Sequence, residues 1–323
     1  GVAVMILAQE GKLNVGDPLS KYLPEFAQLS VLESHDGTTQ LVSADKPITI
    51  KHLLTHTAGL SYFFIDTPLT PYYTKSNHNE PGISLEEYAK RVAQLPLIAH
   101  PGTQWNYSIA MDILGRVVEV VSGQRYGDFL EKRIFKPLKM NDAAFFVPKS
   151  KVYRFAANYT ANPEKDGLVL ADDPHTSTYL TRPGADMGGS GMVCTAGDYL
   201  RFAQMILNRG ELDDVRILEE KSVDEMTTNH LGPEFGEAPL SSMIPFMAQG
   251  IGFGYTGSVV KKGFIRTAVG GEGQYSWGGL ASTDFWIDKK NNLVGLICTQ
   301  LIPNGTYMQR IVFQSAVYDA LEK

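Results

Sequence analysis

Two pairs in this chain place a serine three residues before a lysine: Ser43 with Lys46, and Ser258 with Lys261. On a helix this spacing puts the hydroxyl and the amine one turn apart, where the lysine can help the serine act as a nucleophile. Ser258 stands in a β-type run, where residues three apart point to opposite faces. Ser43 precedes a short helix with a polar face, not the long apolar helix that could bury a nucleophile. About one such pair is expected by chance in a chain of this composition, so we expect both serines to be structural.

Two further patterns resemble hydrolytic motifs without completing them. His52 and His56 have the i, i+4 spacing of a helical zinc pair, but the glutamate that would act as the base is absent. The run GGSGM at 188–192 has Met192 where a nucleophile elbow needs glycine. We therefore expect backbone-bonding histidines, a Gly-rich loop that leads into a helix from Thr195, and neither a metal nor a cofactor.

A third group of residues lies at two predicted element ends. Tyr107 and Ser108 stand where a helix begins, and Trp277, Gly278 and Gly279 stand in a β-rich run. Taken locally, such a tyrosine packs its ring and bonds its hydroxyl to the backbone, and such a tryptophan fills a core. The chemistry of these residues therefore depends on the elements that position them.

Apolar periodicity and capping residues predict that most of the first 250 residues are helical. Thr49 and Ser84 are the expected N-caps of two of these helices, and Gly123 is expected to separate a pair of consecutive helices. The predicted helices cover 47–60, 84–96, 108–138 and 195–212, with a last helix at 308–323.

The chain changes character after residue 250. Short β-rich runs separated by glycines or by the turn sequence DKKNN occupy 253–260, 264–271, 276–288 and 293–300. The expected fold class is α/β in the α+β sense, an antiparallel sheet flanked by helices plus a mostly helical domain. The expected division is 1–250 for the helical domain, which begins with the rear of a buried helix at 1–11, and 251–323 for the sheet and last helix.

Five blocks in this order resemble the serine β-lactamase-like hydrolases, which include class C β-lactamases, DD-peptidases and family VIII carboxylesterases. The blocks are GKLNVGDPLSKYLPEF, PITIKHLLTHTAGL, PGTQWNYSIAMDILGRVVEVVSG, GGSGMVCTAGDYLRFAQMILNRGEL and YSWGGLASTDFWID. The resemblance covers essentially the whole chain and implies a β-lactamase/transpeptidase-like fold.

The resemblance also implies roles for single residues. Members carry a Ser-x-x-Lys motif on a buried helix, a tyrosine motif that Tyr107 matches, and a late strand that Trp277, Gly278 and Gly279 match. Tyr107 would take the serine proton, and the N–H of Leu280 would help form the oxyanion hole. The apolar stretch 1–11 corresponds to the body of the nucleophile helix, so the serine and the lysine are expected just before Gly1.

Two departures from the β-lactamase pattern favour ester substrates. Ile109 stands where β-lactamases have an asparagine, and Trp277 stands where they have a lysine, so two polar contacts become apolar. Ser108 and Ile109 are the substrate-pocket candidates, and 71–82 and 231–250 are the expected pocket walls. The pattern is closest to the family VIII carboxylesterases.

Alternative functions stay open at the level of sequence. One is a β-lactamase or DD-peptidase, and another is a non-catalytic binding member or an inert fragment, if the protein begins at Gly1. The formal net charge of −6 and the lack of a Lys/Arg run argue against nucleic acid, and no apolar run is long enough for a membrane span. A small-molecule ester or β-lactam is the expected partner; the oligomeric state and the compartment have no signal in the sequence.

Overall fold

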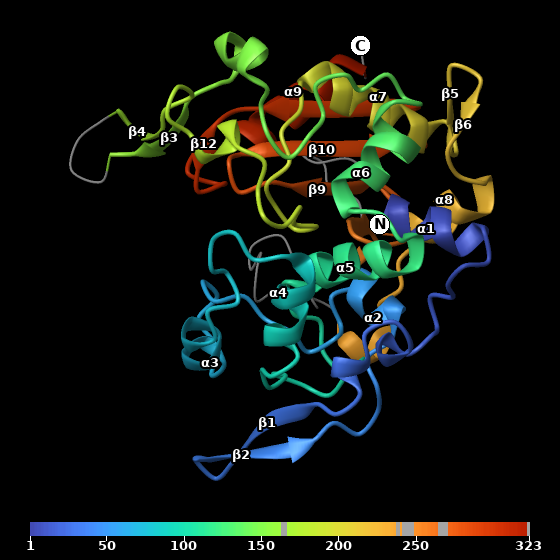
Figure 1. The fold of residues 1–323 in the computed structure, drawn as a ribbon. Coiled ribbons are helices and arrows are strands. Elements are labelled where there is room, and N and C mark those ends of the chain that lie inside the picture. Colours follow the sequence, from blue (N-terminus) through green and yellow to red (C-terminus); the bar gives the residue numbers. More distant parts are fainter. Residues whose placement is uncertain (163–166, 237–239, 241–248, 264–270, 322–323) are drawn as a thin grey trace.

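The computed structural model describes residues 1–323 except 163–166, 237–239, 241–248, 264–270 and 322–323. Figure 1 shows a sheet with its covering helices above a region built mainly of helices. Within the described part of the chain, no helix has the length and apolar character needed to cross a membrane.

The helical region is arranged around α5 (Ala110–Ser122), which contacts α1 (Val2–Gln9), α2 (Ile50–Leu54), α4 (Leu85–Val92) and α6 (Tyr126–Leu130). It ends as predicted at Gly123, whose φ of 67° is the left-handed conformation that glycine adopts without strain. Further helical segments are α3 (Thr70–Lys75), a turn of π-helix at Glu131–Phe135 and α8 (Glu220–Met226).

Capping explains where two predicted helices begin. The Thr49 hydroxyl accepts the His52 N–H at the start of α2, and the Ser84 hydroxyl accepts the Glu87 N–H at the start of α4. The helix predicted over 47–60 is shorter than expected, because His56 adopts a φ of 54° just after Leu54. This early end makes 55–61 a buried loop beneath the site described below.

The main sheet has five antiparallel strands in the order β11-β10-β9-β8-β7. Their bounds are Ile251–Phe253 for β7, Ser258–Val260 for β8, Tyr275–Gly278 for β9, Thr283–Asp288 for β10 and Leu293–Cys298 for β11. The predicted run 264–271 lies outside the described residues except for Gly271. The antiparallel sheet and the helices confirm the predicted fold class.

Two helices cover opposite faces of this sheet. Phe285 of β10 packs against Tyr199 of α7 (Ala196–Leu207), and its neighbour Trp286 packs against Phe313 of α9 (Gln309–Leu321). Neighbouring residues of a strand point to opposite faces, so α7 and α9 sandwich the sheet.

Smaller sheets lie at the periphery (Figure 1). The hairpin of β1 (Ser30–His35) and β2 (Thr38–Ser43) projects from the helical region, and a second hairpin joins β5 (Glu211–Leu212) to β6 (Val215–Arg216). β12 (Leu301–Ile302) pairs in parallel with β3 (Asn158–Ala161), which pairs with β4 (Leu168–Asp172). Short 3-10 turns occupy 19–21, 24–26, 149–154, 178–180 and 233–235.

One large core connects the helical region to the sheet. Buried side chains of α1, α2, α5 and α7 belong to the same cluster as Tyr255, Val259, Tyr275 and Ile287. The main sheet therefore packs on the helical region through a continuous apolar contact, and the division into 1–250 and 251–323 stays a prediction.

Candidate active site

Tyr107 lies half-buried on the loop that leads into α5, surrounded by aromatic rings from three other segments. Its ring centroid is 4.9 Å from that of His56, 5.1 Å from that of Tyr62 and 5.5 Å from that of Trp277. The two predicted motifs, the helix-entry tyrosine and the late Trp-Gly-Gly strand, are thus brought into contact.

Hydrogen bonds to the buried loop after α2 hold the Tyr107 loop in place. The Asn106 N–H donates to the His56 carbonyl at 2.8 Å, and the Asn106 side chain donates to the Leu60 carbonyl at 2.6 Å. The Ser108 hydroxyl is 3.2 Å from Nδ1 of His56, and both side chains are buried. Burial lowers the pKa of His56 to about 3, so this histidine is neutral and serves as a hydrogen-bonding support.

The substrate-pocket candidates Ser108 and Ile109 lie inside the protein, each with 1% of its surface exposed. Ser108 bonds to His56, and Ile109 belongs to the large core at the start of α5. Their predicted contact with substrate stays a prediction, because neither side chain reaches a surface in this structure.

A second apolar cluster lies beneath the site. Tyr107, Trp277 and Phe235 pack against a small core of six buried residues: Trp105, Leu231, Leu240, Ile251, Phe253 and Val260. The described part of the predicted wall 231–250 therefore contributes to this cluster, while 237–239 and 241–248 lie outside the described residues. In the other predicted wall, 71–82, the Tyr73 hydroxyl accepts the N–H of Ser61, close to Tyr62.

The Trp-Gly-Gly strand edge is built by tight packing against β10. A side chain on Gly278 would start 2.3 Å from Oδ1 of Asp284, and one on Gly279 would start 2.3 Å from Oγ1 of Thr283. A side chain at either glycine would therefore displace the Asp284 or Thr283 side chain. Beyond the strand Leu280 has 63% of its surface exposed, and its N–H has no acceptor within the part of the chain that the structure describes.

The surroundings of Tyr107 leave its hydroxyl protonated at neutral pH. Burial raises the pKa of Tyr107, and interactions with Trp277 and Tyr62 act in the opposite direction. The described residues that influence this pKa include no cation, so the lysine implied by the resemblance has no substitute among them.

The remaining motifs have structural roles. Ser43 is exposed at the end of β2, and the Ser258 hydroxyl donates to the Ser276 carbonyl within the sheet. Nδ1 of His52 accepts the Thr49 N–H, whereas His56 bonds to Ser108, so the two histidines face different partners. Among the described residues, no cluster of His, Cys, Asp or Glu could hold a metal ion.

The Gly-rich run 188–192 packs directly on α5. A side chain on Gly188 would start 2.0 Å from the Met111 carbonyl, and one on Gly189 would start 2.9 Å from the Tyr62 hydroxyl. The run leads, as predicted, into a helix whose N-cap is Thr195. Close approach to α5 at Gly188, and to Tyr62 and Asp112 at Gly189, thus explains both glycines without a nucleophile elbow.

Tyr62 and Asp112 were not among the predicted site residues. Asp112 is 3% exposed on α5 between the apolar residues Met111 and Ile113. The residues four before and four after it are Ser108 and Arg116, so the helical pattern did not indicate that Asp112 is buried; nothing in the local sequence distinguishes Tyr62.

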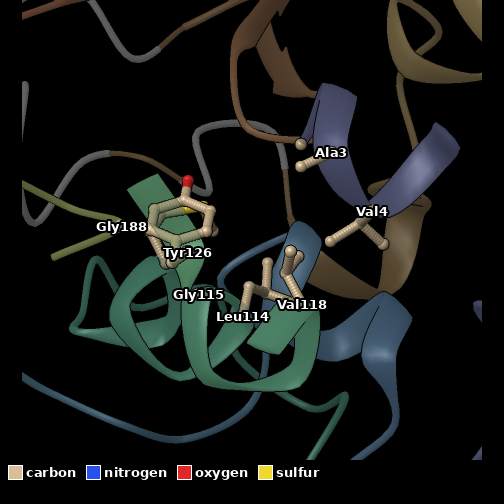
Figure 2. A pocket seen from close by; sticks show the side chains of 9 residues that line it. Ala3, Val4, Leu114, Gly115, Val118, Tyr126 and Gly188 are labelled. Atoms are coloured by element: carbon tan, nitrogen blue, oxygen red, sulfur yellow. The ribbon is translucent and has the colours of Figure 1, made fainter. Parts of the chain in front are cut away.

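A small cavity separates α1 from α5 (Figure 2). Its volume is about 20 Å³, and its lining includes Gly1, Val4, Leu114, Tyr126 and Gly188. This space holds roughly one water molecule, so it is not a substrate pocket.

The family model described as Beta-lactamase matches residues 1–311. The chain belongs to the beta-lactamase family. This membership confirms the family predicted from the five sequence blocks, and it agrees with the observed α/β fold.

Two of the curated relatives are named as esterases, and one similar solved structure is that of a synthase. The chain is 31% identical over 316 residues to lovastatin esterase of Penicillium rubens, covering 93% of this chain and 76% of that protein. It is 30% identical over 341 residues to esterase EstB of Burkholderia gladioli, covering 98% of this chain and 79% of that protein. The fold is also similar to the unliganded, selenomethionyl structure of simvastatin synthase LovD from Aspergillus terreus, with a TM-score of 0.81 and 25% sequence identity. The match covers 100% of this chain and 82% of that one.

Proposed function

We propose that this member of the beta-lactamase family is a serine hydrolase that cleaves carboxylic esters through an acyl-enzyme. The observation that carries the proposal is the contact between Tyr107 and Trp277 above an apolar cluster. The Tyr107 phenol, which can exchange a proton, lies beside the Trp-Gly-Gly strand edge. The backbone N–H of Leu280, the residue after this edge, has no acceptor among the described residues. The esterase names of two relatives support the same chemistry.

The proposed reaction has two steps that share Tyr107. In acylation, the serine oxygen attacks the ester carbonyl carbon, its proton passes to the Tyr107 oxygen, and the leaving alcohol takes that proton as its C–O bond breaks. In deacylation, water attacks the acyl carbon, gives a proton to Tyr107 and releases the carboxylic acid, while the serine oxygen regains the proton. The Leu280 N–H stabilises the developing oxyanion in both steps.

The resemblance assigns the serine and the lysine of this mechanism to residues just before Gly1. A lysine ammonium near Tyr107 would oppose the effect of burial and favour the phenolate. The apolar helix α1, buried against α5, corresponds in the resemblance to the body of the helix that carries these two groups.

Neutral esters fit the site better than β-lactams. Ile109 is buried in the core and Trp277 packs on Tyr107 and Phe253, so neither residue offers the polar contact that the β-lactamase motifs provide. β-Lactam hydrolysis is the second candidate function, supported by the family match itself.

Steady-state kinetics on the full-length protein test this proposal. We expect kcat/KM for short-chain p-nitrophenyl esters to exceed that for nitrocefin by roughly 100-fold, because each missing polar contact is worth about 1 to 3 kcal/mol. Tyr107→Phe should lower ester turnover by about 10²-fold to 10⁴-fold. Tyr153→Phe, at a side chain that is 80% exposed, is the matched control and should change nothing. A Tyr107→Phe enzyme with full activity, or a preference for nitrocefin, would contradict the proposal.

A further inference from the structure

The peptide group that joins Gly279 to Leu280 has functional groups on both of its sides. Its N–H belongs to Leu280 and is the amide that the proposed mechanism directs at the oxyanion. Its carbonyl oxygen belongs to Gly279. Because the peptide group is planar and this bond is trans, the carbonyl and the N–H point in opposite directions. Any group that holds the Gly279 carbonyl therefore also sets the direction of the Leu280 N–H.

Two donors hold this carbonyl oxygen. The Ser282 N–H donates to it at 3.1 Å and closes the turn that follows β9. Nδ2 of Asn304 donates to it at 3.0 Å and also lies 3.4 Å from Oδ1 of Asp284. A carbonyl and a carboxylate can only accept, so the nitrogen of the Asn304 amide, not its oxygen, must face them.

Hydrogen bonds fix the turn that carries Asn304. The buried Ser282 hydroxyl donates to the Leu301 carbonyl at 2.7 Å, so β12 is attached to the turn after β9. Just beyond β12, the Thr306 hydroxyl donates to the Pro303 carbonyl at 2.7 Å. Asn304 lies inside this second turn and is held against the end of β9 although its surface is exposed.

An anchored ion pair lies on the other side of the Asn304 amide. The Asp284 side chain on β10 is 1% exposed, and Nη1 of Arg310, from the first turn of α9, donates to its Oδ1 at 3.1 Å. Nη2 of Arg310 also lies 3.2 Å from the Ser276 hydroxyl on β9. A side chain on Gly278 would start 2.3 Å from Oδ1 of Asp284 and 3.0 Å from Nδ2 of Asn304. These contacts leave little freedom to the amide that reaches Gly279.

We propose that Asn304 is a positioning residue for the oxyanion hole: its side-chain amide donates to the Gly279 carbonyl and so directs the Leu280 N–H at the ester oxygen. A hydrogen bond to a carbonyl also polarises the peptide group and strengthens the N–H on its other side. Asn304 acts through this one peptide group. The inference rests on the proposed esterase mechanism.

Steady-state kinetics of Asn304→Ala and Asn304→Asp in the full-length protein test the role. The aspartate keeps the shape but presents an oxygen where the donor nitrogen was. We expect both variants to lower kcat for p-nitrophenyl acetate by roughly 10-fold and to change KM by less than about 2-fold, because the oxyanion forms only in the transition state. Loss of a whole oxyanion donor costs about 10²-fold to 10³-fold; the effect here is smaller, since the Ser282 N–H still holds the carbonyl.

A thionoester separates positioning of the oxyanion hole from general damage to the strand. In p-nitrophenyl thionoacetate, sulfur replaces the carbonyl oxygen and is a weak acceptor, so the Leu280 N–H contributes little to its turnover. Loss of the Asn304 amide should therefore lower kcat/KM for the oxygen ester by roughly 5-fold more than for the thionoester. Asn141→Ala and Asn141→Asp, at an exposed asparagine, are the matched controls and should leave both reactions unchanged.

A larger loss on the oxygen ester supports the inference. Equal losses on the two esters, or an unchanged kcat, overturn it. Urea denaturation shows whether each variant is folded, and if one Asn304 variant unfolds, the other decides by the same comparison.

Tyr107→Phe is measured in parallel to separate this inference from the proposed function. Full activity of Tyr107→Phe, or no ester turnover by wild type, refutes the proposed function and this inference with it. Turnover that requires Tyr107 but is unaffected by both Asn304 variants refutes only the role of Asn304.

Discussion

At the residue scale, the site depends on a phenol whose surroundings are mainly apolar. Contacts with Trp277, Tyr62 and His56 orient the Tyr107 ring. Burial raises the pKa of Tyr107, so its hydroxyl is a weaker acid than that of an exposed tyrosine. A base at this position therefore requires a cation close by during the reaction. The aromatic contacts supply geometry, and we expect the electrostatic partner to be the lysine that the resemblance implies.

Gly278 offers a residue-scale test of the strand edge. Gly278→Ala would place a methyl group 2.3 Å from Oδ1 of Asp284, so either the buried Asp284 side chain or the strand must shift. We expect a loss of about 1 to 3 kcal/mol in the free energy of unfolding and a roughly 10-fold to 100-fold fall in ester kcat/KM, as for a misplacement of about 1 Å. Urea denaturation and steady-state kinetics measure the two effects.

Gly271 provides the control for that substitution. Among the described residues, a side chain on Gly271 meets no atom within 4 Å, so Gly271→Ala should leave both stability and activity unchanged. Equal effects of the two substitutions would show that the close approach at Gly278 does not position the strand.

The sequence predicted Tyr107, Trp277, Gly278, Gly279 and Leu280 through their place in ordered motifs, and the structure brings the tyrosine and the tryptophan into contact. It did not predict Tyr62, which enters the site only because the helix before it ends early at Leu54. Propensity does not reveal such an end, since the tertiary packing of the loop against the Tyr107 segment determines it.

At the element scale, the start of α2 depends on an uncharged histidine. The Thr49 N–H donates to Nδ1 of His52, and the His52 N–H donates to the Thr49 hydroxyl, each at 3.2 Å. This reciprocal pair is a capping box in which histidine stands where glutamate or glutamine is usual. Protonation would convert Nδ1 from an acceptor into a donor and break one of the two bonds.

The free energy of unfolding should therefore fall when acidification protonates His52 and breaks one bond of this cap. Burial lowers the pKa of folded His52 to about 4 from 6.5, so the unfolded chain binds more protons between these values. The contribution of neutral His52 to the free energy of unfolding is complete above pH 6.5 and is lost as the pH falls toward 4. Between pH 7 and pH 5 we expect wild type to lose roughly 1 kcal/mol more than His52→Gln, which keeps an acceptor without titrating, because solvent around the partly exposed ring weakens the full effect.

Urea denaturation at both pH values measures this difference. His56, whose pKa is also lowered, and Asp112, whose pKa is raised, contribute to the slope in opposite directions. Both remain in the two proteins and cancel in the comparison. Identical acid dependence of wild type and His52→Gln would show that the cap does not depend on the neutral histidine.

Element types were largely predictable because caps and periodicity are local. Thr49, Ser84, Gly123 and Thr195 mark helix ends as expected. The hairpin of β1 and β2 was not predicted, although Asp36 and Gly37 form its two-residue turn with positive φ and are residues that such a turn favours.

At the scale of the whole molecule, the order of elements indicated the fold, but their packing required the structure. The antiparallel sheet after residue 250 was visible in short β-rich runs, whereas its placement between α7 and α9 depends on long-range contacts. The continuous core between α1, α5 and the sheet likewise has no local signature. This core holds the Tyr107 loop and the Trp277 strand in fixed relation.

The central claim is that this molecule acylates a serine with the help of Tyr107. The most direct measurement is labelling of the full-length protein with a fluorophosphonate probe, followed by intact-mass spectrometry and peptide mapping. We predict a single adduct on a serine that precedes Gly1, blocked by a short-chain p-nitrophenyl ester and strongly slowed in Tyr107→Phe. An adduct on Ser43, Ser108 or Ser258, or the absence of any adduct, would contradict the account.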